Sequence, residues 1–132
     1  MAEQDVDGEC PIDLESAREY AGDDEALLCE LFAVFLREAR GHVTALRDAF
    51  RAGRAGDVMD LAHTLKGSLR LLGAPATALL AEQLEIGGRS SQLEGLGPVV
   101  EQFDREMARL FQWVETRLTT PAPGKTIAPE TA

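Results

Sequence analysis

Apolar side chains recur at steps of three and four residues along most of the chain, which is the spacing of one buried face of an α-helix. Four long segments show this pattern, and a short one precedes them. The short segment runs from Asp13 to about Tyr20. The first long segment begins at Asp23 or Asp24 and ends at Gly53 or Gly56. The other three cover 58–72, Pro75 to about Ile86, and Pro98 to about Leu118. No segment alternates with the period of two that marks a strand, so the pattern predicts an all-α fold.

Residues with known helix-capping preferences separate these segments. Asp57 is predicted to cap the 58–72 helix, which ends at Gly73, and Pro75 occupies the first-turn position that tolerates proline. The pair Gly87-Gly88 is predicted to end the helix that Pro75 begins. Because the turns are short, neighbouring helices must run antiparallel. The sequence therefore predicts an up-down four-helix bundle with a short extra N-terminal helix.

The two ends of the chain lack the helical pattern. Residues 1–11 are acidic and have few apolar side chains, and 119–132 contain three prolines and one large apolar residue. Neither segment buries enough apolar surface to offset its ordering entropy, so we expect a flexible N-terminal segment and a disordered C-terminal tail around a domain at 12–118. The initiator methionine and the tail favour a stand-alone protein over a piece of a larger kinase.

Composition and charge exclude several classes of function. The 132 residues carry a formal net charge of −10, which argues against binding to nucleic acid or to anionic lipid. No apolar run is long enough to span a bilayer and no targeting segment is visible, so we expect a cytoplasmic protein. Neither a metal-ligand spacing nor a glycine-rich nucleotide loop is present, so no cofactor is expected.

The 58–72 helix has a core face and a row of chemically useful residues. Its core face is predicted to contain Val58, Leu61, Ala62, Leu65, Leu69 and Leu72. His63, Lys66, Gly67 and Arg70, spaced i, i+3, i+4 and i+7, form a row roughly 120–140° from that face. Met59, one turn before His63, gives the row an apolar edge.

These residue types suit the acceptance of a phosphoryl group. An imidazole is a nucleophile near neutral pH, and a neighbouring ammonium offsets charge on phosphoryl oxygens. A glycine inside a helix costs about 1 kcal/mol relative to alanine, so Gly67 needs a reason, such as the close approach of a partner. The spacing alone is more often that of a solvated helix face.

The motif and its context resemble a known family. The pattern His63-x-x-Lys66-Gly67-x5-Gly73-Ala74, preceded by Ala62 and followed by Leu84-Glu85, is similar to the signature of the histidine-containing phosphotransfer (HPt) domain. The resemblance extends over about residues 12–118.

The resemblance implies a monomeric phosphorelay intermediate without kinase activity of its own. His63 would be phosphorylated by the aspartate of a receiver domain, in a response regulator or a hybrid histidine kinase, and would pass the group to another receiver. Lys66 would stabilise the phosphate, Gly67 and Met59 would lie in the partner-binding surface, and the magnesium ion would belong to the receiver. Family members often place a polar side chain on the neighbouring helix to hydrogen-bond the imidazole, and Gln83 is the candidate here unless it is simply a solvated side chain.

The sequence departs from the usual family pattern after Gly67, where Ser68-Leu69-Arg70-Leu71 replaces small or polar residues. Leu69 is expected in the core and Leu71 outside the row. Arg70 would either contact the phosphoryl group and the partner or hinder docking. A second histidine, His42, lacks a following Lys-Gly pair, so a structural or surface role is expected for it.

Two other functions fit the same sequence. The chain could be a non-catalytic adaptor that docks a kinase or a receiver, or a plain helical bundle whose motif is accidental. Replacement of His63 by glutamine separates the first from a phosphocarrier, because only phosphotransfer requires the imidazole.

Overall fold

The computed structural model describes residues 12–119 and contains five helices in that range. They are α1 (Leu14–Tyr20), α2 (Glu25–Ala52), α3 (Ala55–Leu72), α4 (Pro75–Arg89) and α5 (Gly97–Thr119). The segments predicted to be flexible and disordered, 1–11 and 119–132, lie outside the described residues except for Thr119, which ends α5.

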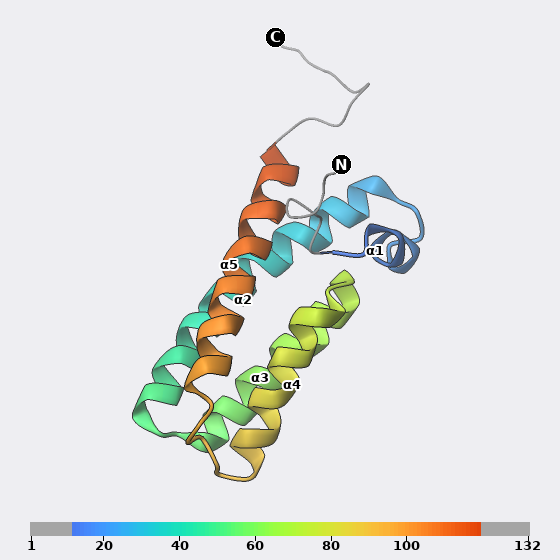
Figure 1. The fold of residues 1–132 in the computed structure, drawn as a ribbon. Helices are drawn as coiled ribbons and strands as arrows, with labels where there is room; N and C mark the ends of the chain where they lie inside the picture. Colours follow the sequence, from blue (N-terminus) through green and yellow to red (C-terminus); the bar gives the residue numbers. More distant parts are fainter. Residues whose placement is uncertain (1–11, 120–132) are drawn as a thin grey trace, which may run out of the picture.

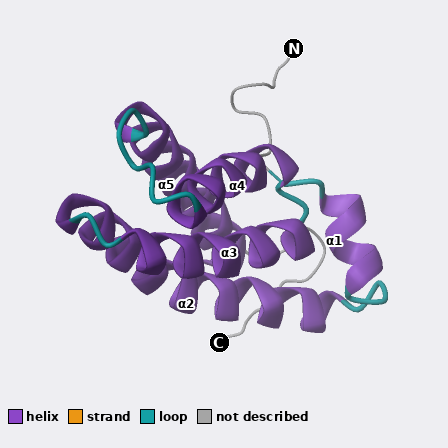
Figure 2. Ribbon diagram, turned by 90° about the horizontal axis from the view of Figure 1, so that it is seen from below, coloured by secondary structure: helices purple, strands orange, loops and turns teal. Residues whose placement is uncertain are grey.

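The four long helices form an antiparallel bundle, and α1 lies across one end of it (Figure 1). Each long helix packs against two of the others, because α2 contacts α3 and α5, and α4 contacts α3 and α5. Figure 2 shows α1 beside the end of the bundle where α3 turns into α4. There, the backbone amide of Asp13 donates a hydrogen bond to the carbonyl of Gly73 at 2.5 Å. The predicted four-helix bundle with an extra N-terminal helix is confirmed.

Capping residues define several of the helix ends. The carboxylate of Asp13 accepts a hydrogen bond from the amide of Ser16 at the start of α1, and Asp24 does the same for Leu27 at the start of α2. Gly53 and Gly73 end α2 and α3 in the left-handed conformation, with φ of 75° and 83°. These ends lie where the sequence predicts them.

Two predicted boundaries are wrong. The α3 helix begins at Ala55, so Asp57 lies in its first turn instead of capping it, and the Asp57 carboxylate pairs with Arg54 at 3.0 Å. The α4 helix continues through Gly87 and Gly88 to Arg89. Both glycines are buried against neighbouring chain segments, so packing holds them in the helix although their intrinsic propensity is low.

The core lies between the four long helices and consists of the predicted apolar faces. Its largest fully buried side chains are Phe32, Phe103, Leu28, Leu46, Leu65, Leu69, Leu84, Met107, Leu110, Val58 and Val114. Trp113 is half-buried and meets the ring of Phe32 edge to face, with 5.9 Å between the ring centroids. No helix within 12–119 is both long enough and apolar enough to cross a membrane.

Candidate functional site

The row of residues predicted on α3 lies on the outside of the bundle. The predicted core face of this helix is buried, apart from Leu61, which is half-buried. His63 is the most exposed member of the row, with 68 % of its side chain accessible, whereas the side chain of Lys66 is only 15 % accessible. Gly67 and Arg70 are exposed. The helix therefore presents an imidazole to solvent and directs the ammonium group one turn further along into the protein.

The carboxylate of Glu85 on α4 joins the functional groups at this position. One oxygen, Oε2, lies 2.9 Å from Nδ1 of His63 and 2.9 Å from a guanidinium nitrogen of Arg89. The other, Oε1, lies 2.6 Å from Nζ of Lys66. Only 5 % of the Glu85 side chain is exposed, so this carboxylate is one of the few buried polar groups in the described chain.

The protonation state of Glu85 decides which nitrogen of His63 carries the proton. Hydrogen bonding by Lys66 holds the pKa of the Glu85 carboxyl below its ordinary value of 4.5, and His63 adds to the effect, although burial acts in the opposite direction. An ionised carboxylate only accepts hydrogen bonds, so Nδ1 of His63 must carry the proton and donate it. In the neutral ring, the lone pair is then on Nε2.

The cluster has an excess of positive charge. Lys66 and Arg89 bring two cations to one carboxylate, so the group is net positive even when the imidazole is neutral. The guanidinium of Arg89 is 59 % exposed, and it shares the oxygen to which His63 is bonded. The net positive charge of this cluster would therefore attract an anion that reached the exposed ring.

Sequence reasoning assigned no role to Arg89 and used Glu85 only as part of a motif. A usable signal is present, because Ala78, Ala81, Glu85 and Gly88 recur at steps of three and four and are all buried. A glutamate on the buried face of a helix requires partners, and Arg89, four residues later, is one of them.

Glu85, and not Gln83, is the hydrogen-bond partner of the imidazole. Gln83 is exposed, and it lies two residues before Glu85, which is about 200° around the helix. The prediction that Gln83 holds His63 is therefore wrong, because it depended on the unknown rotation of α4 about its axis. A contact of Gln83 with a partner stays a prediction.

The other predicted partner-binding residues lie along α3. A Cβ atom added to Gly67 would meet no atom within 4 Å, so packing inside the described chain does not require a glycine there. Arg70 is 56 % exposed and pairs with Glu82 of α4 at 3.5 Å. Met59 is half-buried, and its backbone packs against α4. Their contacts with a partner stay predictions.

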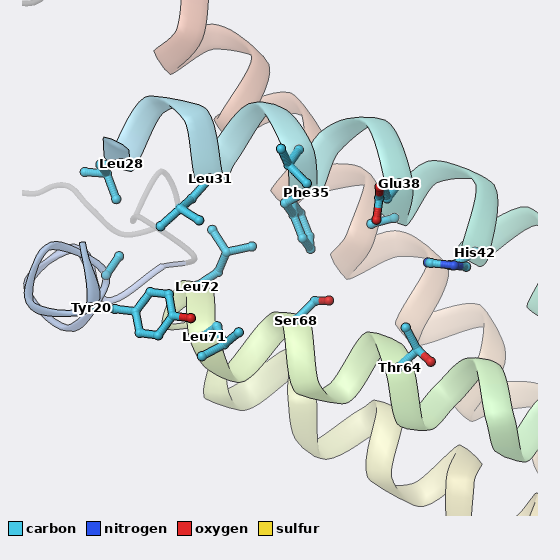
Figure 3. Close-up of a pocket in the computed structure, with 13 residues that line it drawn as sticks. Tyr20, Leu28, Leu31, Phe35, Glu38, His42, Thr64, Ser68, Leu71 and Leu72 are labelled. Atoms are coloured by element: carbon cyan, nitrogen blue, oxygen red, sulfur yellow. The ribbon is translucent and has the colours of Figure 1, made fainter. Parts of the chain in front are cut away.

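An apolar groove lies on the opposite side of α3, between this helix, α2 and α1 (Figure 3). It has a volume of about 170 Å³. Its walls are formed by Ala17, Tyr20, Leu28, Leu31, Val34, Phe35, Glu38, Ala39, His42, Thr64, Ser68, Leu71 and Leu72. His42 is half-buried in this wall, away from the Glu85 cluster. Leu71, which the sequence predicts to lie outside the row, is an exposed part of the same wall.

No metal centre is visible in the described part of the chain. Residues 12–119 contain no group of three or more His, Cys, Asp or Glu side chains that could hold a metal ion. The interactions around Glu85 are instead those of a hydrogen-bonded ion cluster.

Comparisons with known proteins concern the family and the fold of the chain. The Hpt domain family model matches residues 30–113, which include α3, α4 and the whole Glu85 cluster. Histidine-containing phosphotransfer protein B from Pseudomonas aeruginosa PAO1 has a similar structure, with a TM-score of 0.74 and 23 % identity over 81 % of this chain and 93 % of that one. The HPT domain of a sensor hybrid histidine kinase from Shewanella gives a TM-score of 0.75 and 19 % identity over 83 % of this chain and 94 % of that one. A comparison with curated protein sequences gave no match.

Proposed function

This chain belongs to the Hpt domain family, and on that premise we propose that it carries a phosphoryl group on His63 between receiver domains of a two-component phosphorelay. The family consists of phosphocarriers that act in two-component signalling. The proposed partners are receiver domains of response regulators or of hybrid histidine kinases. The proposed role is that of an intermediate and not of a kinase.

One observation carries the proposal: His63 is exposed, yet its Nδ1 atom is held by a buried carboxylate. The hydrogen bond to Glu85 at 2.9 Å fixes the ring orientation and the tautomer. The exposed side of the ring then presents Nε2 to an incoming group. A solvated surface histidine would have no need of a partner that is 5 % exposed.

The transfer step follows from this arrangement. Nε2 of His63 attacks the phosphorus atom of a phosphoaspartate, the bond between phosphorus and the aspartate oxygen breaks, and the electron pair returns to the aspartate carboxylate. Because Nδ1 keeps its proton, the phosphorylated ring is cationic, and the negative charge of Glu85 stabilises it. In the second transfer, a carboxylate oxygen of the other receiver's aspartate attacks the phosphorus atom, the bond between phosphorus and Nε2 breaks, and its electron pair returns to Nε2 of His63.

The two cations of the cluster favour the transferred group. Lys66 is held on Glu85, and Arg89, which is more exposed, can turn from Glu85 toward a phosphoryl oxygen. The magnesium ion that assists such transfers would be bound by the receiver domain. The exposed Gly67, one turn from His63, would let the receiver surface approach closely.

The experiment is intact-mass measurement after the chain is mixed with a panel of phosphorylated receiver domains. We expect a gain of one phosphoryl group on the wild type and no gain on His63→Gln. His42→Gln is the matched control, because it removes the second histidine of the described chain and should still be phosphorylated. NMR of the product should place the phosphorus on Nε2.

Other outcomes would identify a different function. Binding of a receiver without phosphoryl gain would indicate the adaptor function. Phosphorylation of His63→Gln would overturn the assignment of the acceptor. If no receiver in the panel bound or phosphorylated the chain, the phosphorelay role would be overturned.

A further inference from the structure

At Gly88, α4 approaches the backbone of α3 closely. A Cβ atom added to Gly88 would lie 2.7 Å from the carbonyl oxygen of Ala55 and 2.7 Å from the amide nitrogen of Met59. In the α-helical pattern, the amide of Met59 donates its hydrogen bond to the carbonyl of Ala55, so both atoms belong to the backbone of α3. Since neither is the end of a flexible side chain, any larger residue at 88 must move one helix away from the other.

The neighbouring glycine packs against a different part of the protein. A Cβ atom on Gly87 would meet the side chain of Leu96 and the carbonyl oxygen of Gln92, both in the connection to α5. Leu96 is only half-buried, and its side chain can turn aside. Of this pair of glycines, Gly88 is therefore the one that controls the separation of α3 and α4.

The contact at Gly88 lies one turn from the Glu85 cluster on both helices. Glu85 precedes Gly88 by three residues on α4, and His63 follows Met59 by four residues on α3. The hydrogen bond between Glu85 and His63 is 2.9 Å long, and such bonds weaken beyond about 3.2 Å. If a side chain at position 88 displaced the helices by a few tenths of an ångström, the distance between Glu85 and His63 could therefore rise to the length at which the bond weakens.

We propose that Gly88 is a positioning residue for phosphotransfer, because its missing side chain brings α4 close enough for Glu85 to hold His63. Gly88 acts through Glu85 and does not touch the reacting atoms. This inference rests on the proposed function of His63. Glycine has a low intrinsic helix propensity, and the close approach, which alanine would prevent, explains its presence inside α4.

The test is Gly88→Ala, read by the two ¹⁵N chemical shifts of the His63 ring and by the rate of phosphoryl acceptance. We expect the wild-type ring to carry its proton on Nδ1 and the variant to shift toward the Nε2 tautomer. The rate of acceptance should fall about tenfold. The tautomer measurement needs no partner, so it distinguishes a failure of this proposal from a failure of the proposed function.

Gly87→Ala is the matched control, because it adds the same methyl group in the same turn without pressing on α3. It should leave both the tautomer and the rate unchanged. An equal effect of the two variants, or an unchanged His63 tautomer in Gly88→Ala, would overturn the proposal. Loss of helical circular dichroism in Gly88→Ala would also overturn it, since Gly88 would then be required for the fold itself.

A double variant tests whether the effect passes through Glu85. In a Glu85→Ala background, addition of Gly88→Ala should change the rate by much less than it does in the wild type, because the side chain that contacts His63 is already absent. Full additivity of the two substitutions would show that Gly88 acts by another route.

Discussion

The two sides of α3 are packed in opposite ways. Toward α4, the backbones approach closely at Gly88, and a carboxylate is buried among an imidazole, an ammonium and a guanidinium. Toward α2 and α1, the same helix leaves an apolar groove of about 170 Å³, in which Ser68 and Thr64 face α2 (Figure 3).

This difference explains how one helix can hold the His63 ring in place and yet remain accessible. The close contact on the α4 side fixes Glu85 and thereby His63. The exposed Gly67 lies between the two sides, next to Ser68 of the groove. Rigidity thus comes from one neighbouring helix, and open surface is left beside the other.

The largest effect is expected when a bulky side chain is added to each side in turn. Gly88→Leu should destabilise the protein by about 3 kcal/mol, because its side chain would overlap the backbone of α3. Ser68→Leu should change stability by less than about 0.5 kcal/mol, because the groove has room for it. Urea denaturation of both variants makes the measurement, and equal losses would contradict the described difference in packing.

The local pattern of the chain was sufficient to predict the helices and the row on α3. Asp13, Asp24, Gly53 and Gly73 act within one helical turn, so capping rules identify them without tertiary information. The spacing of His63 and Lys66 likewise depends only on the period of the helix that contains them.

Apart from the start of α3, the errors in the sequence-based predictions concern how two helices meet. Gly87-Gly88 has the composition of a helix stop, and only the approach of α3 and of Leu96 keeps it helical. Gln83 and Glu85 are equally polar as a sequence pattern, and the rotation of α4 decides which of them reaches His63. Such rotations arise from packing over the whole bundle and are absent from any local window.

A smaller effect is expected when a carboxylate is removed from each side. Glu85→Ala should cost about 2 kcal/mol of unfolding free energy, because it leaves the largely buried Lys66 without this ionic partner. The matched variant Glu38→Ala removes an exposed carboxylate from the groove wall and should stay within about 0.5 kcal/mol of the wild type. If Glu85→Ala were as harmless as Glu38→Ala, the buried cluster would not contribute to the stability of the α3–α4 pair.

The smallest effect is a difference in acid sensitivity between the two sides. Glu85 lies on the α4 side, and Asp13 caps α1, a helix that lines the groove. The pKa of each carboxyl group is lowered, from ordinary values of 4.5 for Glu85 and 3.8 for Asp13. Hydrogen bonding by Lys66 is the main cause for Glu85, and hydrogen bonding by the Ser16 side chain is the main cause for Asp13. A carboxyl group whose pKa is lowered by folding stabilises the protein above its unfolded value, and this contribution disappears as the pH falls through the folded value. The difference in Tm between the wild type and Glu85→Gln should therefore shrink once the pH falls below 4.5, whereas that for Asp13→Asn should persist until the pH is below 3.8. Thermal melts from pH 6 to pH 3 measure both differences. A Glu85→Gln difference that stayed constant over this range would mean that the carboxylate charge on the α4 side adds nothing to folding, and that its role is confined to the hydrogen bond with His63.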